Sequence, residues 1–221
     1  MFKIIKIPKK LIQAVNKDIL ICLSKLFDKK VLNQDDIFIF LRKNPDVRPQ
    51  VFDILNMLPI LSYINFHIKE IIEKNISKNF LINWTYPQIR LDDTLSKKFS
   101  APAHKDRWII NKDKKGYIAW IPLKKSGSSL LIANKENTKK NILNSYWGIE
   151  AVGPNKFTRK TINYGDALIF DPDLLHKSDS PNNSRITLQL RYEEIQPKNF
   201  RRSVTQKVDS KVLQYWKKKL L

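Results

Sequence analysis

The chain has 221 residues, of which 42% are hydrophobic, so it can bury a sizeable core and general disorder is excluded. Its formal net charge is +20, and its only cysteine, Cys22, excludes a disulfide framework and favours a reducing compartment. No stretch reaches the ~18 uninterrupted apolar residues of a membrane span, and residues 1–10 lack the apolar core of a signal peptide. We therefore expect a cytoplasmic protein without a membrane span, beginning with a short edge strand.

The positive charge comes from 41 Lys and Arg residues against 21 Asp and Glu residues. The lysines fall singly or in twos and threes, as in Lys9-Lys10 and Lys217-Lys218-Lys219, rather than in one block. This spread favours a solvated surface, with an anion-binding face as the alternative.

The first 80 residues show the spacing of amphipathic helices. Apolar residues recur at helical intervals from Leu11 to Leu26, and a second pattern runs from Val51 through residues 67–74. Asp35 or Asp36 is predicted to cap a short helix that ends near Phe40. Pro45 and Pro49 are predicted to separate the helices. Residues 1–80 thus form a predicted helical extension packed on the core.

From about residue 80 the pattern changes to short alternating runs bounded by turn residues, which predicts strands. The expected strands are residues 81–92, 108–111, 117–123, 129–133, 148–152, 157–162, 167–170 and 185–192. This number of short strands favours a mainly β fold with a helical N-terminal layer (α+β), specifically a cupin-like jelly roll or double-stranded β-helix. We expect one compact domain, with the jelly-roll core at 81–200 and a C-terminal helix within 201–221.

Two of the three histidines stand where a mononuclear metal centre would need them. His104 and Asp106 lie on the same side of a strand because side chains alternate, and His176 would arrive from a neighbouring strand. Two imidazoles and one carboxylate are the facial triad of non-haem Fe(II) oxygenases. Arg185, nine residues beyond His176, can hold the far carboxylate of 2-oxoglutarate through a bidentate pair.

Longer segments around these residues carry a family likeness. They are residues 164–188 (YGDALIFDPDLLHKSDSPNNSRITL), 87–92 (PQIRLD), 104–106 (HKD), 119–123 (AWIPL) and 127–131 (GSSLL). In this order over residues 86–192, the chain resembles the phytanoyl-CoA dioxygenase-like family of Fe(II)/2-oxoglutarate-dependent oxygenases. The resemblance implies a double-stranded β-helix that uses Fe(II), 2-oxoglutarate and O2.

The resemblance also assigns roles to single residues. It makes His104, Asp106 and His176 iron ligands with a catalytic role, and Arg185 the partner of 2-oxoglutarate. Further expected co-substrate contacts are Ser178, Trp120, Gln88 and Asp92, and expected substrate contacts are Arg90 and Trp108. For Trp120 and Trp108 the alternative is ordinary core packing, and for Gln88, Arg90 and Asp92 it is the polar outer face of a strand.

The resemblance predicts hydroxylation of a small metabolite or biosynthetic intermediate, with release of succinate and CO2. Because the halogenating branch lacks the carboxylate ligand, Asp106 favours hydroxylation, or a related desaturation or ring closure. The lysine excess suggests an anionic or carrier-linked substrate. Two alternatives stay open: a nucleic-acid-modifying oxygenase, which we do not expect without an aromatic and basic groove, and a non-catalytic metal-binding β-helix that serves as an interaction module. The oligomeric state is left open.

Overall fold

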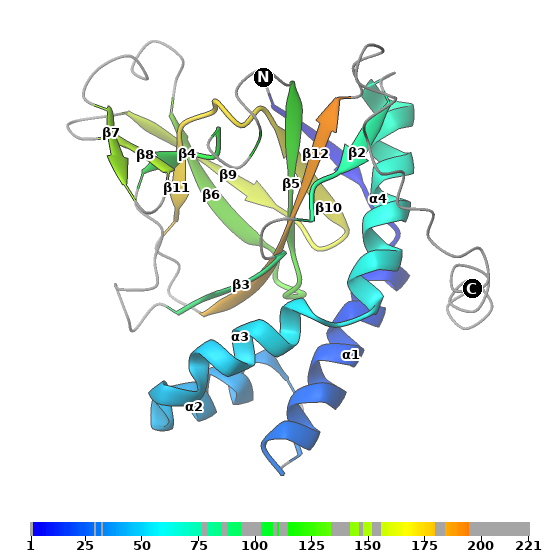
Figure 1. Ribbon diagram of the computed structural model, residues 1–221, viewed down its shortest axis with the longest axis vertical. Coiled ribbons are helices and arrows are strands. Elements are labelled where there is room, and N and C mark those ends of the chain that lie inside the picture. Colours follow the sequence, from blue (N-terminus) through cyan, green and yellow to red (C-terminus); the bar gives the residue numbers. More distant parts are fainter. Residues whose placement is uncertain are drawn as a thin grey trace.

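Three layers make up the fold: a layer of helices, a first β-sheet that the helices cover, and a second β-sheet on the far side of the first (Figure 1). The structure is a computed structural model. It describes residues 2–28, 30–31, 33–76, 79–84, 88–93, 103–107, 110, 115–133, 142–145, 148–151, 156–179 and 184–194. The predicted C-terminal helix and Trp108 lie outside the described residues.

The helical layer lies at the N-terminal end of the chain, as predicted. It contains α1 (Lys9–Leu26), α2 (Gln34–Lys43), the short 3-10 helix η1 (Pro45–Val47), α3 (Arg48–Asn56) and α4 (Ile60–Ile76). The pattern predicted to continue from residue 51 to residue 74 is broken between α3 and α4, where Pro59 stands just before α4. Because proline lacks an N–H, it is tolerated at a helix start and not inside one.

The predicted cap of α2 is wrong, because the capping residue is Asn33 rather than Asp35 or Asp36. The Asn33 side chain accepts hydrogen bonds from the backbone N–H groups of Asp35 and Asp36, at 2.8 and 3.1 Å. The Asp36 carboxylate in turn accepts the Asn33 backbone N–H, which completes a capping box. The two acids lie in the first turn, where the helix dipole favours negative charge.

Both sheets are antiparallel. The first contains β1 (Phe2–Lys6), β10 (Asp166–Phe170), β5 (Gly116–Pro122) and β12 (Arg185–Glu194) in that order, and β2 (Phe80–Ile82) and β3 (Ile89–Asp92) both pair with β12. The second runs in the order β7 (Ile142–Ser145), β8 (Gly148–Ala151), β4 (His104–Lys105), β11 (His176–Ser178), β6 (Ser128–Ala133) and β9 (Phe157–Ile162). The single strand predicted at 81–92 is two strands, and β7 was not predicted.

Eight of these strands form one long hairpin that is rolled up. The strand pairs β6·β9, β5·β10, β4·β11 and β3·β12 are nested one outside the next, and successive pairs alternate between the two sheets. This nesting is the connectivity of a jelly roll. The predicted mainly β fold with a helical layer and a double-stranded β-helix is therefore confirmed.

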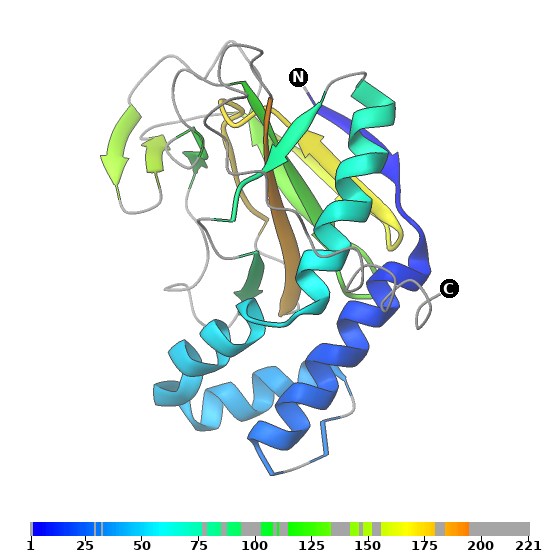
Figure 2. The ribbon, with the colours of Figure 1, turned by 45° about the vertical axis from the view of Figure 1, so that its right-hand side comes forward.

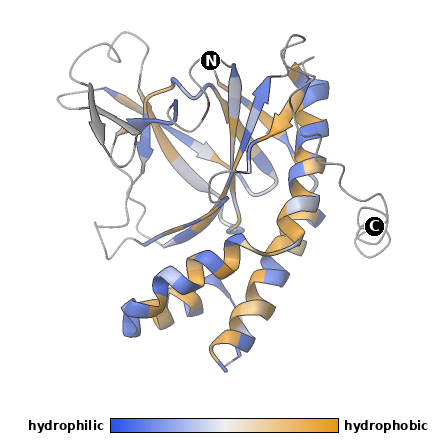
Figure 3. Cartoon of the chain, viewed as in Figure 1, coloured by the Kyte–Doolittle hydropathy of each residue, from blue (hydrophilic) through white to orange (hydrophobic). Residues whose placement is uncertain are grey.

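Side-chain alternation divides the apolar residues between two cores. Ala119 and Ile121 of β5 face the helices and pack with residues such as Val15 of α1, whereas Ile118 and Trp120 face the second sheet. Figure 2 shows α1 and α4 running side by side along the covered sheet. Hydrophobic and hydrophilic positions alternate along these helices (Figure 3). The space between the sheets thus lies apart from the helical layer, with its own wall of apolar residues.

Among the described residues, no single helix is long and apolar enough to cross a membrane. One bent pair, Pro45–Asn56 with Ile60–Ile76, meets the length and composition test only when the two pieces are taken together, across a bend of 56°.

A buried ionic junction fastens the helical layer to the sheets beside the end of β3. Arg42 of α2 donates to both carboxylate oxygens of Asp93, at 3.3 and 2.9 Å, and to the hydroxyl of Ser184 at 2.8 Å. The Ser184 hydroxyl donates to Asp93, and Arg48 of α3 lies 4.0 Å from the same carboxylate. Because Asp93 is only 4% exposed, its charge depends on these partners.

We predict that Arg42→Ala lowers the free energy of unfolding by about 2 kcal/mol, because it removes charge-assisted hydrogen bonds from the buried Asp93 carboxylate. The loss is limited because Arg48 still lies near that carboxylate. Lys124→Ala is the matched control, since Lys124 also joins α2 to the sheet layer, through Asp35, whose side chain is 62% exposed. An exposed pair of this kind contributes at most about 1 kcal/mol. Urea unfolding of both variants measures the difference, and equal losses would contradict the assignment.

Candidate metal centre and co-substrate site

The pairing of β4 with β11 brings together two residues that are 72 positions apart in the chain. His104 and His176 are direct Cα partners in this pairing, and their ring centroids are 4.4 Å apart. Asp106 follows β4 and directs one carboxylate oxygen to each ring, at 3.5 Å from His104 Nε2 and 3.7 Å from His176 Nε2. One ligand atom from each of the three residues lies within 4.8 Å of the others. The predicted triad is therefore assembled.

A backbone carbonyl fixes the orientation of the His176 ring. Nδ1 of His176 lies 3.0 Å from the carbonyl oxygen of Leu174. Because a carbonyl only accepts, the hydrogen in this bond is carried by Nδ1, and Nε2 is left with its lone pair. The ring of Phe170 packs edge-on against the imidazole, with centroids 4.9 Å apart. His176 therefore presents the nitrogen that binds a metal toward Asp106 and His104.

Burial and neighbouring charges keep the His176 imidazole and the Asp106 carboxyl in the protonation states that bind a metal. Burial lowers the pKa of His176 to about 4, with a further contribution from His104, so the imidazole is neutral at pH 7. Burial alone would raise the pKa of Asp106, but the hydrogen bond with His104 and the charges of His176, His104 and Arg191 outweigh it. The pKa of Asp106 is therefore held below its usual range, and the carboxylate is ionised. This set of two imidazoles and one carboxylate fits Fe(II).

Arg185, at the start of β12, is held from three sides by neighbouring strands. Its Nε donates to Asp92 of β3 at 3.0 Å, and its Nη1 donates to the Ser128 hydroxyl and the Ser129 carbonyl of β6, at 2.8 and 2.6 Å. The guanidinium also lies over the ring of Trp120, 5.3 Å from the centroid. The side chain is only 2% exposed, so its position is fixed before any ligand arrives.

One nitrogen of this guanidinium has no hydrogen-bond acceptor among the residues that the structure describes. Nη2 of Arg185 is buried and unpartnered, and so is the hydroxyl of Thr187, two residues further along the inner face of β12. A buried N–H group without an acceptor is costly, so such a group in a native fold calls for a missing partner. A carboxylate is the partner that a guanidinium fits best. The residues present therefore fit 2-oxoglutarate beside Fe(II), with O2 as the remaining reactant.

The other predicted co-substrate contacts lie in differing surroundings. Trp120 is buried between the sheets and contacts Arg185, as described above. Ser178 lies on β11 opposite Leu130 and is half-buried, and its contact with a co-substrate stays a prediction. Asp92 binds Arg185 through Oδ2, and its Oδ1 lies 3.5 Å from Nη2 of Arg90. In this structure Asp92 therefore positions the arginine.

Gln88 has a partner on the helical layer. Its side-chain oxygen accepts a hydrogen bond of 2.6 Å from Asn65 of α4, whose own side-chain oxygen accepts from the Tyr192 hydroxyl at 3.2 Å. β2 and β3 pair with separate stretches of β12, and Gln88 lies just before β3, where it can reach α4. Its co-substrate role stays a prediction, as does the substrate role of Arg90.

The sequence analysis missed Ser128, which contributes one of the oxygens that hold Arg185. The turn before it depends on Gly127, which has a φ of +72° and donates its backbone N–H to the Lys124 carbonyl at 2.9 Å. A Cβ at position 127 would lie 2.5 Å from the Ile162 carbonyl oxygen, so the tight turn requires glycine. A glycine followed by two serines between two strand patterns was the available signal.

Comparison with solved structures finds proteins of low sequence identity. No protein-family model and no curated protein matches the chain. AviO1 from Streptomyces viridochromogenes Tue57 is 14% identical, with 87% of this chain and 89% of that one covered and a TM-score of 0.47. The non-heme alpha ketoglutarate dependent carbocyclase SnoK from nogalamycin biosynthesis is 13% identical, with 74% and 77% covered and a TM-score of 0.43. A 2OG-Fe(II) oxygenase family protein from Burkholderia pseudomallei is 13% identical, with 62% and 59% covered and a TM-score of 0.37. Since these values are low, we base the fold on the strand order and the site on its own side chains.

The lowered pKa of His176 makes a pH-dependent contribution to the stability of the metal-free protein. In the unfolded chain the imidazole binds a proton below about pH 6.5, whereas in the folded protein it does so only below about pH 4. Stability is therefore unaffected above pH 6.5 and falls by about 3 kcal/mol as the pH drops from 6.5 to 4. Urea unfolding across this range should show a shallower pH dependence in His176→Gln, and an unchanged dependence would contradict burial of a neutral ring. Asp106 contributes only at the acid end of this range, because the unfolded carboxyl starts to bind a proton near its ordinary pKa of 3.8 while the folded one stays ionised.

Proposed function

We propose that this protein is an Fe(II)- and 2-oxoglutarate-dependent oxygenase that hydroxylates a small molecule. The observation that carries the proposal is the combination of a buried, ligand-competent His-Asp-His set with a fixed, buried arginine that lacks one hydrogen-bond acceptor. When bound, the iron and 2-oxoglutarate supply the oxidising power: the 2-oxo acid is converted to succinate and CO2, and one oxygen atom of O2 enters the substrate.

The protein's own residues would position these reactants and exclude water. His104, Asp106 and His176 would hold the metal from one side. Arg185 would receive the far carboxylate of 2-oxoglutarate through Nη2, and Trp120 would limit the space beneath the guanidinium. Because Asp92, Ser128 and Ser129 already occupy the other guanidinium N–H groups, Arg185 needs no rearrangement to bind the ligand.

The chemistry of the substrate is a further part of the proposal. Arg90 and Arg191 carry positive charge near the iron ligands, since the charge of Arg90 lowers the pKa of His176 and that of Arg191 lowers the pKa of Asp106. This supports the anionic, small or carrier-linked substrate expected from the sequence. The cytoplasmic location and the absence of a nucleic-acid partner stay predictions. Hydroxylation, rather than desaturation or ring closure, also stays a prediction.

An anaerobic titration with Fe(II) and 2-oxoglutarate tests the proposal. We expect the weak visible charge-transfer band of the Fe(II)–2-oxoglutarate chelate in the wild-type protein and in Lys124→Ala, which changes only the exposed pair with Asp35. His176→Ala removes a ligand and should abolish the band. A wild-type protein that binds iron and 2-oxoglutarate without forming the band, or binds neither, would remove the oxygenase assignment and favour a non-catalytic module.

The affinity for 2-oxoglutarate tests the role of Arg185 separately. In the Fe(II)-loaded, oxygen-free protein, Arg185→Ala should weaken binding by about 2–4 kcal/mol, roughly 30-fold or more, because it removes a desolvated ion pair. Ser128→Ala should cost less, about 1 kcal/mol, since Arg185 keeps Asp92 and the Ser129 carbonyl. Equilibrium titration of the band gives both values. Equal affinities in the wild type and Arg185→Ala would assign the 2-oxoglutarate carboxylate to another residue.

A further inference from the structure

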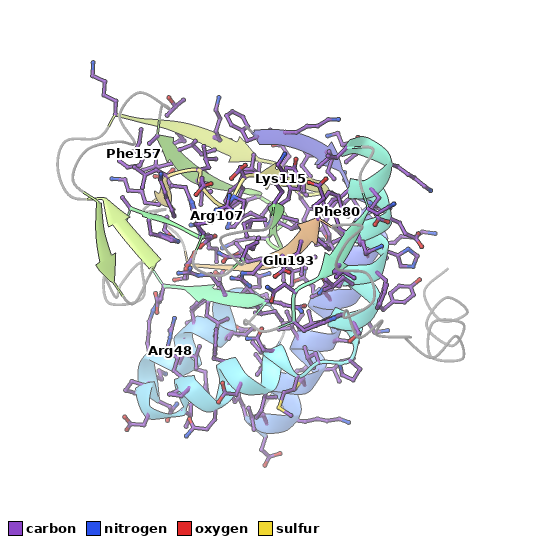
Figure 4. All side chains as sticks on the ribbon, turned by 45° about the horizontal axis from the view of Figure 1, so that its top comes forward. Arg48, Phe80, Arg107, Lys115, Phe157 and Glu193 are labelled. Atoms are coloured by element: carbon purple, nitrogen blue, oxygen red, sulfur yellow. The ribbon has the colours of Figure 1, made fainter. Side chains whose placement is uncertain are left out.

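Arg107, the residue immediately after the ligand Asp106, spans to the segment that leads into His176. Its Nη2 lies 3.1 Å from a carboxylate oxygen of Asp171 and also donates to the carboxylate of Asp173. Figure 4 labels Arg107 among the strands, apart from Arg48 on the helices. The Arg107 side chain is 17% exposed, whereas those of Asp171 and Asp173 are 42% and 55% exposed. One side chain thus joins the two chain segments that supply metal ligands.

The segment that Arg107 contacts is a tight turn with a function in the site. The Leu174 N–H donates to the Asp171 carbonyl at 2.8 Å, and the Asp173 N–H donates to the Asp171 carboxylate at 2.9 Å. These bonds place the Leu174 carbonyl, which accepts the Nδ1–H of His176. The shape of the turn therefore decides which His176 nitrogen is available to a metal.

We propose that Arg107 is a positioning residue for the metal centre, which it acts on through the 171–174 turn rather than by touching the metal. This inference rests on the metal site of the proposed function. Arg107 holds the turn against the segment that carries Asp106, and the turn holds His176 in one tautomer and one orientation. Arg107 thereby fixes the distance between Asp106 and His176, because it is bonded to the segments that carry both residues.

Two features of the site explain why the contacts of Arg107 with Asp171 and Asp173, called the clamp below, are needed. β4 has two residues and β11 has three, and among the described residues one pair, His104 with His176, joins them. A pairing this short constrains the segments beyond it weakly. In addition, Asp171 and Asp173 place two carboxylates in one turn, and without the guanidinium between them they repel each other. Removing Arg107 would therefore loosen the turn without changing any ligand.

Binding of Co(II), used in place of Fe(II), tests the inference without catalysis. We expect Arg107→Ala to weaken Co(II) binding by about 10- to 100-fold and to change the visible absorption of the bound ion, as loss of a group that orients a metal ligand does. Arg107→Lys, which keeps one charge, should recover part of the affinity. Lys124→Ala is the control, because its side chain pairs with Asp35 of α2 rather than with the segments that carry the metal ligands, and it should bind Co(II) as the wild type does.

The outcomes separate the clamp from the metal site itself. If the wild type binds Co(II) and folded Arg107→Ala binds it with the same affinity and spectrum, the clamp is overturned and the metal site stands. If the wild type binds no Co(II), both the site and the clamp are overturned. Should Arg107→Ala fail to fold, Asp173→Asn keeps the arginine and the side-chain shape, removes one carboxylate charge, and is expected to weaken Co(II) binding in the same direction.

Discussion

The candidate site depends on one cross-strand residue pair, His104 with His176. A register shift of one residue would turn either imidazole to the other face of the sheet, because side chains alternate along a strand. The pair lies in the shortest step of the rolled hairpin, so its register is set by the longer steps around it. β5·β10 on the inner side and β3·β12 on the outer side each pair over several residues. The metal centre thus takes its geometry from contacts that lie outside it.

Two adjacent acids, Asp92 and Asp93, divide the tasks at the end of β3. Asp92 holds Arg185 in the space between the sheets, whereas Asp93 receives Arg42 and approaches Arg48 from the helical layer. Neighbouring side chains at a strand end point to opposite sides, so one dipeptide can serve both. Asp93, which binds the helical layer, is therefore the sequence neighbour of Asp92, which positions Arg185. Both of these buried carboxylates are paired with arginines, as burial of charge demands.

The sequence predicted the features that depend on local pattern. The strand starting at Arg185 and the jelly-roll class follow from period and spacing, and they are found in the structure. His104 and Asp106 lie together as predicted, but β4 ends at Lys105, so Asp106 lies just after the strand rather than on it. Features that depend on distant partners were not predictable in this way. Asn33 rather than Asp35 caps α2 because backbone geometry chooses among several capable residues. Gln88 reaches Asn65 of α4 because β2 and β3 are separate strands that pair with different stretches of β12. No local sequence pattern predicts two strands there instead of one.

The unpaired nitrogen of Arg185 has a consequence for the protein as a whole. Arg185 joins β12 to β3 and β6, so a carboxylate that binds Nη2 supplies the last missing contact of a residue shared by both sheets. A ligand that binds only the folded state raises its stability in proportion to the logarithm of its concentration. If 2-oxoglutarate is that ligand, as proposed above, its concentration would set the equilibrium stability of the fold as well as the rate of the reaction. Such a ligand would form a buried ion pair that the chain cannot form by itself, so it would act as part of the protein interior while it is bound.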